Sequence, residues 1–227
     1  TSGVACIVDA TFHPGPQRAI LTSAHAAPDT FLSMGVVMSA TAALDWTARL
    51  SGTTAATLAG EAEAMPLQKL AESPVFLPCL TGIRTPANRP QATGRIEGLH
   101  PGVDRAMIGY ATMEGVAFQM ADCVTAQREV GARPERFVAV GGGTRSALWT
   151  TLLATAIGEP IALPARGDIG GPAGAARLAA VAAGASTDVL SAPLPMRATI
   201  EPDPALAQRL APRKARFDTL VESARRG

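Results

Sequence analysis

Three consecutive glycines, Gly141 to Gly143, are the residues of this sequence best suited to hold a ligand. They follow an apolar run and precede a helical pattern that begins near Ser146. Glycine lets the main chain approach a ligand closely, and a helix start offers free N–H groups and a positive dipole end to phosphate. A plain tight turn would need the same residues. The sequence therefore predicts either an anion site or a turn, and the Rossmann and P-loop glycine patterns are both absent.

A second candidate is the N-terminal triplet of Thr1, Ser2 and Gly3. Small hydroxyl residues beside a glycine can clasp a phosphate through main-chain N–H groups and Oγ atoms when they form a sharp bend. A frayed chain end would have the same composition, so the triplet alone leaves both interpretations open.

Glu114 is a carboxylate on the apolar stripe of a long predicted helix, residues 103–130. It is either a catalytic acid or base or a buried group that accepts hydrogen bonds, and we favour main-chain N–H groups of a neighbouring loop as its partners. Arg84 either contacts an anion or pins its own loop, and the second interpretation is favoured. The three cysteines are widely separated and form no metal-ligand or disulfide pattern.

The elements that must position these residues follow from periodicity and turn formers. Apolar runs around a stretch rich in Pro and Gly predict an N-terminal β-hairpin, and apolar residues at helical spacing predict helices. The basic and acidic C-terminal segment is expected to form a solvated helix. The predicted α/β order begins with a hairpin of strands 4–8 and 19–22, helix 31–50, helix 55–70 interrupted by Pro66, a strand at 75–77 and a loop at 78–102. It continues with helix 103–130, a buried strand at 136–140, helix 146–157, a strand at 161–163 and helix 173–183.

Composition narrows the classes of partner. The chain has 227 residues, with 20 Lys and Arg against 19 Asp and Glu, so no basic excess favours nucleic acid or an anionic membrane surface. No apolar run reaches about 18 residues, so no membrane span is expected. Thiols without a disulfide pattern favour the cytoplasm. Because the chain starts without Met, we expect it to have been cut from something longer.

A succession of short motifs, each weak alone, is specific in its order and spacing. The chain resembles the C-terminal domain of the FGGY family of carbohydrate kinases over about residues 1–184, and within that family the kinases that act on xylulose. The motifs are TSGV at 1–4, LDW at 44–46, FLPCLTGIRTP at 76–86, GRIEGL at 94–99, MEGVAF at 113–118, GGGTRSALW at 141–149 and GAA at 174–176.

The resemblance implies an α/β fold of the actin-like, ribonuclease-H-like type, with residues 1–227 forming the C-terminal, ATP-binding domain. It implies transfer of phosphate from MgATP to a ketopentose, D-xylulose, in a cleft between two domains. In this family the catalytic Asp precedes the TSG bend and the sugar site lies mainly in the N-terminal domain, so we expect neither in this chain. Mg²⁺ is expected to be held by phosphates and waters, without a protein ligand here.

The same resemblance assigns nucleotide contacts to residues of this sequence. Thr1, Ser2 and Gly3 match the bend that holds the phosphates, and Glu114 matches a carboxyl position in the family's second signature. Thr41 and Asp45 match two helix positions that face the nucleotide. Gly142, within Gly141–Gly143, matches the main chain that cradles the nucleotide, and Ser146 matches a polar residue near the adenine.

The chain departs from the family at four positions. Cys79 replaces an aromatic residue and Ile83 replaces an acidic one, while Thr41 stands where Gly is commoner and Asp45 where a longer polar side chain is usual. The alternative to a kinase is a non-catalytic actin-like module for nucleotide binding or association, with an exposed apolar surface that could support a homodimer. The chain alone is expected to bind nucleotide weakly and to be inactive as a kinase.

Overall fold

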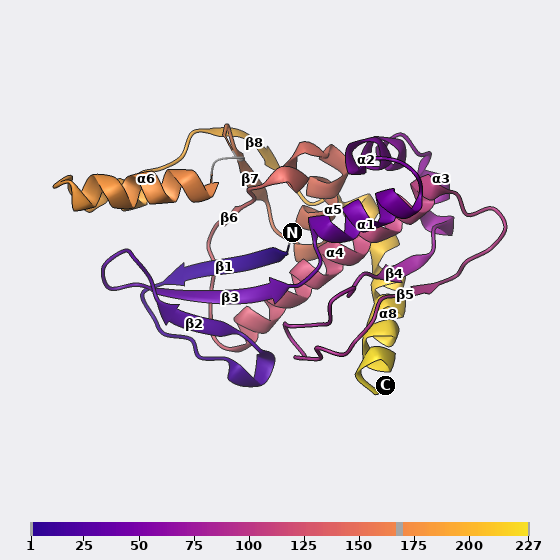
Figure 1. Ribbon diagram of the computed structural model, residues 1–227, viewed down its shortest axis with the longest axis horizontal. Coiled ribbons are helices and arrows are strands. Elements are labelled where there is room, and N and C mark those ends of the chain that lie inside the picture. Colours follow the sequence, from indigo (N-terminus) through magenta and orange to yellow (C-terminus); the bar gives the residue numbers. More distant parts are fainter. Residues whose placement is uncertain (1, 167–169, 227) are drawn as a thin grey trace.

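The structure, a computed structural model, describes residues 2–166 and 170–226 of a mixed α/β chain (Figure 1). The N-terminal sheet has the order β1-β3-β2, in which β1 (Gly3–Asp9) and β2 (Leu21–Ala24) both pair antiparallel with β3 (Phe31–Val37). The predicted hairpin between the first two strands is therefore wrong, because β3 lies between them. The 3₁₀ turn η1 (Pro16–Arg18) lies in the connection.

Residues 31–37, predicted as the start of a helix, form β3 instead. The apolar residues of this segment fit a period of two as well as one of 3.6. In the strand, Ser33, Gly35 and Val37 form the buried face. A Cβ at Gly35 would lie 2.7 Å from the Cβ of Cys123, so glycine lets this strand lie close to the long helix beneath it. The helix starts later, as α1 (Thr41–Leu50).

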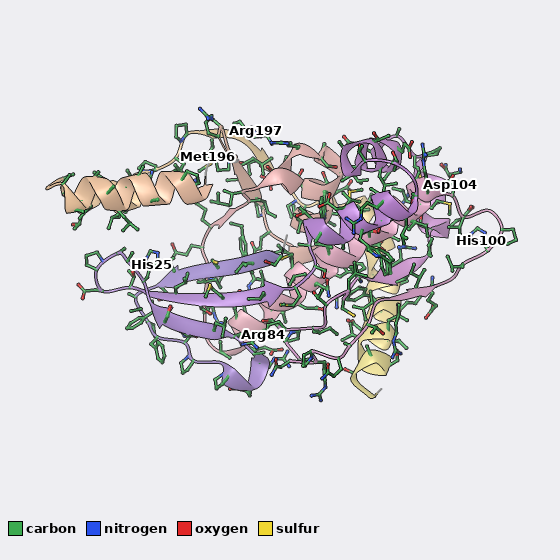
Figure 2. The ribbon with its side chains drawn as sticks, viewed as in Figure 1. His25, Arg84, His100, Asp104, Met196 and Arg197 are labelled. Atoms are coloured by element: carbon green, nitrogen blue, oxygen red, sulfur yellow. The ribbon has the colours of Figure 1, made fainter. Side chains whose placement is uncertain are left out.

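The central element is α4 (Arg105–Glu129), which lies within the predicted range of 103–130. Asp104 caps it by accepting a hydrogen bond from the N–H of Met107 at 3.0 Å (Figure 2). The predicted helix 55–70 is divided at Pro66, as a proline there requires. The elements packed around α4 include α2 (Ala55–Glu63), α3 (Leu67–Glu72), α5 (Ala147–Ile157) and β4 (Val75–Leu77). The strand β5 (Arg95–Glu97) pairs antiparallel with β4.

A further sheet has the order β6-β7-β8. Its first strand is shorter and more exposed than the predicted buried strand 136–140: Val138 is 42% and Val140 53% exposed. The third strand was not predicted. The elements are β6 (Phe137–Val138), the 3₁₀ turn η2 (Gly142–Arg145), β7 (Ile161–Pro164), α6 (Gly170–Ala182), α7 (Asp188–Ser191), β8 (Met196–Ile200) and α8 (Pro204–Arg226).

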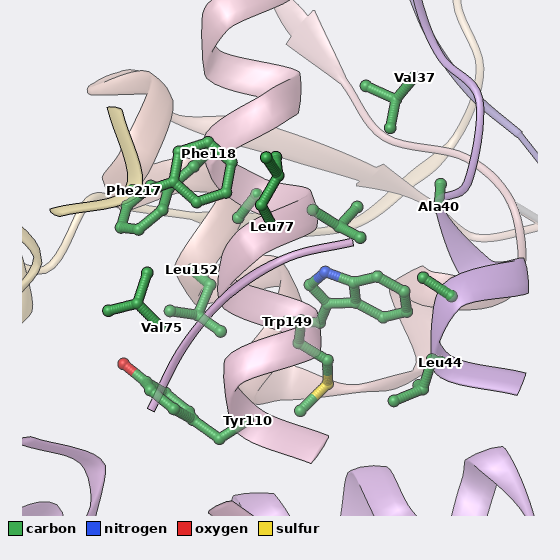
Figure 3. Close-up of a cluster of buried hydrophobic side chains, with 14 of the residues drawn as sticks. Val37, Ala40, Leu44, Val75, Leu77, Tyr110, Phe118, Trp149, Leu152 and Phe217 are labelled. Carbon is green, nitrogen blue, oxygen red and sulfur yellow. The ribbon is translucent and has the colours of Figure 1, made fainter. Parts of the chain in front are cut away.

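The expectation of a solvated C-terminal helix is wrong. Leu206, Leu210 and Phe217 of α8 are buried in the same cluster as α4 and β4, and the Phe217 ring lies 5.3 Å from that of Phe118 (Figure 3). The charged residues of α8 suggest an exposed helix, but its apolar stripe faces the core.

Glu114 is buried by α8 rather than by a loop. Arg213 of α8 donates Nε–H and Nη2–H to the two carboxylate oxygens, at 2.6 and 2.8 Å, and the Tyr110 hydroxyl donates at 3.0 Å. The guanidinium also donates to the carbonyls of Ser73 and Pro74. The buried structural role is confirmed, but the partners are side chains rather than the predicted N–H groups. Burial raises the pKa of the Glu114 carboxyl, and the paired guanidinium works against that rise.

Candidate functional site

A cavity of about 710 Å³ lies between β1 and the segment that runs from Arg133 to Thr144. This volume is within the range of about 300–1,000 Å³ that small-molecule sites occupy. The wall residues come from β1, the start of α1, the face of α4, β6 and the glycine turn, which are far apart in the sequence. The predicted site residues that line the cavity are Ser2, Gly3, Thr41, Gly141, Gly142 and Gly143.

Two of the predicted residues that the structure describes are not part of this wall. Asp45 is exposed on α1, one helical turn after Thr41, and Ser146 lies at the start of α5. A ligand confined to this cavity would not touch either side chain. Thr1 lies outside the described residues.

Gly3 does not lie in the predicted bend: it is the first residue of β1 and packs against the start of α1. A Cβ at Gly3 would lie 2.9 Å from the Cβ of Ala40 and 3.2 Å from the sulfur of Met120. The glycine is thus required by packing against these two side chains. Because Gly3 has no side chain, the beginning of β1 lies close to the start of α1, and Gly3 and Thr41 both line the cavity.

The second bend is built from residues that leave its main chain accessible. Gly141 has φ +101°, a conformation that favours glycine, and a Cβ at Gly142 would meet nothing within 4 Å. The N–H and the Oγ1–H of Thr144 both donate to the carbonyl of Gly141, at 3.2 and 2.8 Å. These bonds close the turn η2 and leave the open side of Gly142 facing free space.

Ser146 serves as the N-cap of α5. Its Oγ accepts a hydrogen bond from the N–H of Trp149 at 3.2 Å, and its hydroxyl donates to Glu63 Oε2 at 3.2 Å. One of the helix N–H groups that the sequence suggested for a phosphate is therefore already occupied. The helix and its αL stop at Gly158 otherwise agree with the prediction.

The indole of Trp149 packs against the glycine turn, a contact that the sequence did not predict. Its six-membered ring would lie 3.4 Å from a Cβ at Gly143, and Figure 3 shows the indole beside Ala40 and Leu44. The side chain lines the cavity, is 4% exposed, and its Nε1–H has no hydrogen-bond partner among the described residues. An unpartnered buried donor is costly unless a water or ligand accepts from it.

Gln127 is a second polar side chain that sequence reasoning missed. Its Nε2 donates to the carbonyls of Ala5 and Ser33 at 3.0 Å, which joins α4 to β1 and β3. Its Oε1 has no partner among the described residues, and the residue lines the cavity. A polar residue on the buried stripe of a long helix was the available signal.

The other candidate side chains lie elsewhere. Glu114 belongs to the buried pair with Arg213, and Arg84 donates to Asn88 Oδ1 at 3.4 Å within its own loop, as a loop-pinning role predicts (Figure 2). Over residues 2–166 and 170–226 no group of three side chains could hold a metal ion, and no helix is long and apolar enough to cross a membrane.

Comparison with known proteins identifies the family to which the chain belongs. A sequence model of the FGGY family of carbohydrate kinases, C-terminal domain, matches residues 1–183. The chain is 36% identical to a xylulose kinase of Escherichia coli (strain K12) over 227 residues, which cover 98% of this chain and 46% of that protein.

Solved structures agree with this result. A crystal structure described as a xyloylose kinase from Brucella ovis aligns with a TM-score of 0.90 and 37% identity, over 98% of this chain and 47% of that one. A xylulose kinase from Rhodospirillum rubrum aligns with a TM-score of 0.81 and 27% identity, over 98% of this chain and 45% of that one. The chain thus spans about half the length of the relatives it matches. It belongs to the FGGY family of carbohydrate kinases, as its motifs predicted, and it has the fold of that family's C-terminal domain.

Proposed function

We propose that residues 1–227 form the ATP-binding domain of a sugar kinase that transfers the γ-phosphoryl group of MgATP to a ketopentose, D-xylulose. The family implies a nucleotide and a sugar, and the similar proteins named xylulose kinase support this sugar. The observation that carries the proposal is that Ser2, Gly3, Thr41 and the turn Gly141–Gly143, predicted from separate segments, line one cavity.

In this proposal the chain binds and orients the nucleotide. Main-chain N–H groups of Ser2, of Gly3 and of the glycine turn donate to phosphate oxygens, because the glycines leave the main chain accessible. Thr1 remains a predicted phosphate contact. The open side of Gly142 fits a ligand with acceptor oxygens. Asp45 and Ser146 remain predicted contacts outside the cavity.

MgATP, when bound, supplies the phosphoryl group, and the magnesium is held by phosphates and water. The chain contributes N–H donors that favour the charge developing on the phosphoryl oxygens, and closure of the second domain excludes water. The general base that accepts the proton of the sugar hydroxyl is a carboxylate outside this chain. The free thiols of Cys6, Cys79 and Cys123 support a cytoplasmic location.

The test is a pair of alanine substitutions in the complete protein that contains this chain. Gly142→Ala places a methyl group in the space where the proposal puts the nucleotide, and Gly171→Ala, whose Cβ also meets nothing within 4 Å, is the control on α6. We expect G142A to raise KM for MgATP about tenfold, the equivalent of about 1.4 kcal/mol, and G171A to leave it unchanged. Equal KM values for the wild type and both variants would contradict the proposed site.

The sugar is tested by a coupled assay of the complete protein with xylulose, ribulose, glycerol and gluconate. We expect the highest kcat/KM for xylulose. The 227-residue chain alone is expected to bind ADP weakly in calorimetry and to phosphorylate no sugar. Sugar-dependent turnover by this chain alone would overturn the placement of the base.

A role in association is the second candidate, favoured by one observation. Val4, Val8 and Leu21 are 42%, 50% and 40% exposed, and the register of the sheet places them on one face of β1, β3 and β2. Such an apolar face supports contact with a second domain or a second copy. Light scattering of the complete protein tests the homodimer: a mass of one chain excludes it.

A further inference from the structure

Arg197 of β8 reaches the glycine turn from outside the segment that the family model matches, residues 1–183. Its Nη2–H donates to the carbonyl oxygen of Thr144, in η2, at 2.8 Å. Figure 2 shows this residue beside Met196 where the chain enters β8. The proposed function makes no use of Arg197.

Arg197 lies at a β-bulge, on the exposed side of β8. In the pairing of β7 with β8, Leu163 lies opposite Ala198 and Pro164 lies opposite Met196, so Arg197 has no partner on β7. A bulge adds an unpaired residue and bends the strand. The exposure of β8 alternates through the bulge, with Arg197 and Thr199 exposed between half-buried neighbours, so the guanidinium reaches the turn from the exposed face of the strand.

The hydrogen bonds within the turn are local. Thr144 donates twice to the carbonyl of Gly141, and the N–H of Ser146 donates to the carbonyl of Gly143 at 3.3 Å. The end of the turn is held by Ser146, which caps α5 and donates to Glu63, and Arg197 holds Thr144. Glycine loses more conformational freedom than any other residue on ordering, so the three glycines alone would place the turn poorly.

We propose that Arg197 is a positioning residue for nucleotide binding, which acts by holding Thr144 and thereby the main chain of Gly142 and Gly143 at the cavity wall. This inference rests on the proposed function. Its bond is charge-assisted and therefore stronger than an ordinary hydrogen bond to a carbonyl. With the bond removed, the glycine turn samples positions in which its N–H groups no longer converge on the phosphates, so binding of MgATP weakens while the chemical step keeps its rate.

The experiment compares three variants of the complete protein. Arg197→Gln removes the charge and the reach, and Arg197→Lys keeps a cationic donor. Arg177→Gln is the matched control, because Arg177 is another arginine whose guanidinium donates to main-chain carbonyls, those of Leu190 and Ala192, and it does not line the cavity. The measurements are kcat, KM for MgATP and for the sugar, and the thermal midpoint with and without ADP.

We expect R197Q to raise KM for MgATP about five- to tenfold, with kcat and KM for the sugar unchanged, and R197K to lie between R197Q and the wild type. The midpoint without ADP should stay unchanged while the upward shift produced by ADP shrinks, because ligand stabilisation depends on affinity. R177Q should behave as the wild type.

Two results would overturn the assignment. One is an R197Q protein whose KM for MgATP equals that of the wild type; the other is a fall in the ADP-free midpoint with both KM values raised together, which marks a general structural role. If the wild-type protein itself shows no ATP-dependent turnover and no ADP-induced shift, the proposed function fails instead, so the two failures are distinguishable.

Discussion

Removal of the Arg213 side chain tests how α8 is held to the domain. In Arg213→Met the Glu114 carboxylate, 1% exposed, keeps only the Tyr110 hydroxyl as a donor. The carbonyls of Ser73 and Pro74 lose their donors as well. Breaking a buried ion pair by deleting one partner costs about 3–5 kcal/mol, because the remaining charge is buried without compensation. We expect a loss of that size in the free energy of unfolding.

The control lies one helical turn further along α8. Arg216 pairs with Glu97 at 2.9 Å, but both side chains are more than 40% exposed, so Arg216→Met should cost about 0–1 kcal/mol. Urea unfolding followed by circular dichroism measures both variants. A loss in R213M no greater than that in R216M would refute the argument that burial decides the value of the pair.

The pH dependence of the same variant gives a second check. A buried carboxyl without its guanidinium partner has a higher pKa in the folded than in the unfolded chain, so the folded state binds more protons. The stability of R213M is therefore highest at low pH, and it falls as the pH rises above the pKa of the carboxyl in the unfolded chain, about 4.3. We expect the deficit of R213M relative to the wild type to be larger at pH 7 than at pH 4.5. A deficit that is constant over this range would mean that Glu114 does not carry the cost.

Two further predictions concern glycines in the helices α2 and α4 and the N-terminal cap of α4. Gly115→Ala would place a Cβ onto the carbonyl oxygen of Phe76, so it should destabilise the chain by more than about 3 kcal/mol, whereas Gly60→Ala, with open space, should stabilise it by about 0.5–1 kcal/mol in urea unfolding. Asp104→Ala should cost about 1 kcal/mol. Lys69 and the capped N–H group hold the pKa of Asp104 below its usual value. The stability that the wild type has over D104A is therefore present above pH about 4 and is lost as the pH falls further. A stability difference that does not change with pH would contradict this.

The sequence predicted long uninterrupted helices well and tertiary choices poorly. The ranges of α4 and α5 agree with the predictions because neither run contains proline and each is followed by a glycine that ends it, Gly131 and Gly158. The strand β3 was mistaken for helix because its apolar residues satisfy both periods, and only pairing with β1 and β2 selects one. The five residues of β8 alternate apolar and polar, a strand pattern that the prediction missed, and the pairing of this strand with β7 is long-range.

For the candidate site, the sequence showed which residue types could bind a ligand, but it did not show which contacts require those residues. The glycine turn stands out as three consecutive residues, and its open side at Gly142 fits the predicted use. Gly3, chosen for the same reason, is required by contact with Ala40, which no single sequence reveals. Ser146 has the hydroxyl that was expected, but that hydroxyl caps α5. Trp149 and Gln127 reach the cavity only because β1 lies next to α4 and α5.

The segment beyond residue 183 connects the core to the site. Arg213 neutralises a carboxylate in the middle of α4, and the helix that carries it buries Phe217 against Phe118. Arg197, at the bulge before that helix, holds the turn that faces the cavity. Without this segment Glu114 would lose its cation, and the apolar side chains that α8 covers would be exposed to water. The contacts therefore support the proposal that the whole chain, beyond the part that the family model matches, acts as one domain.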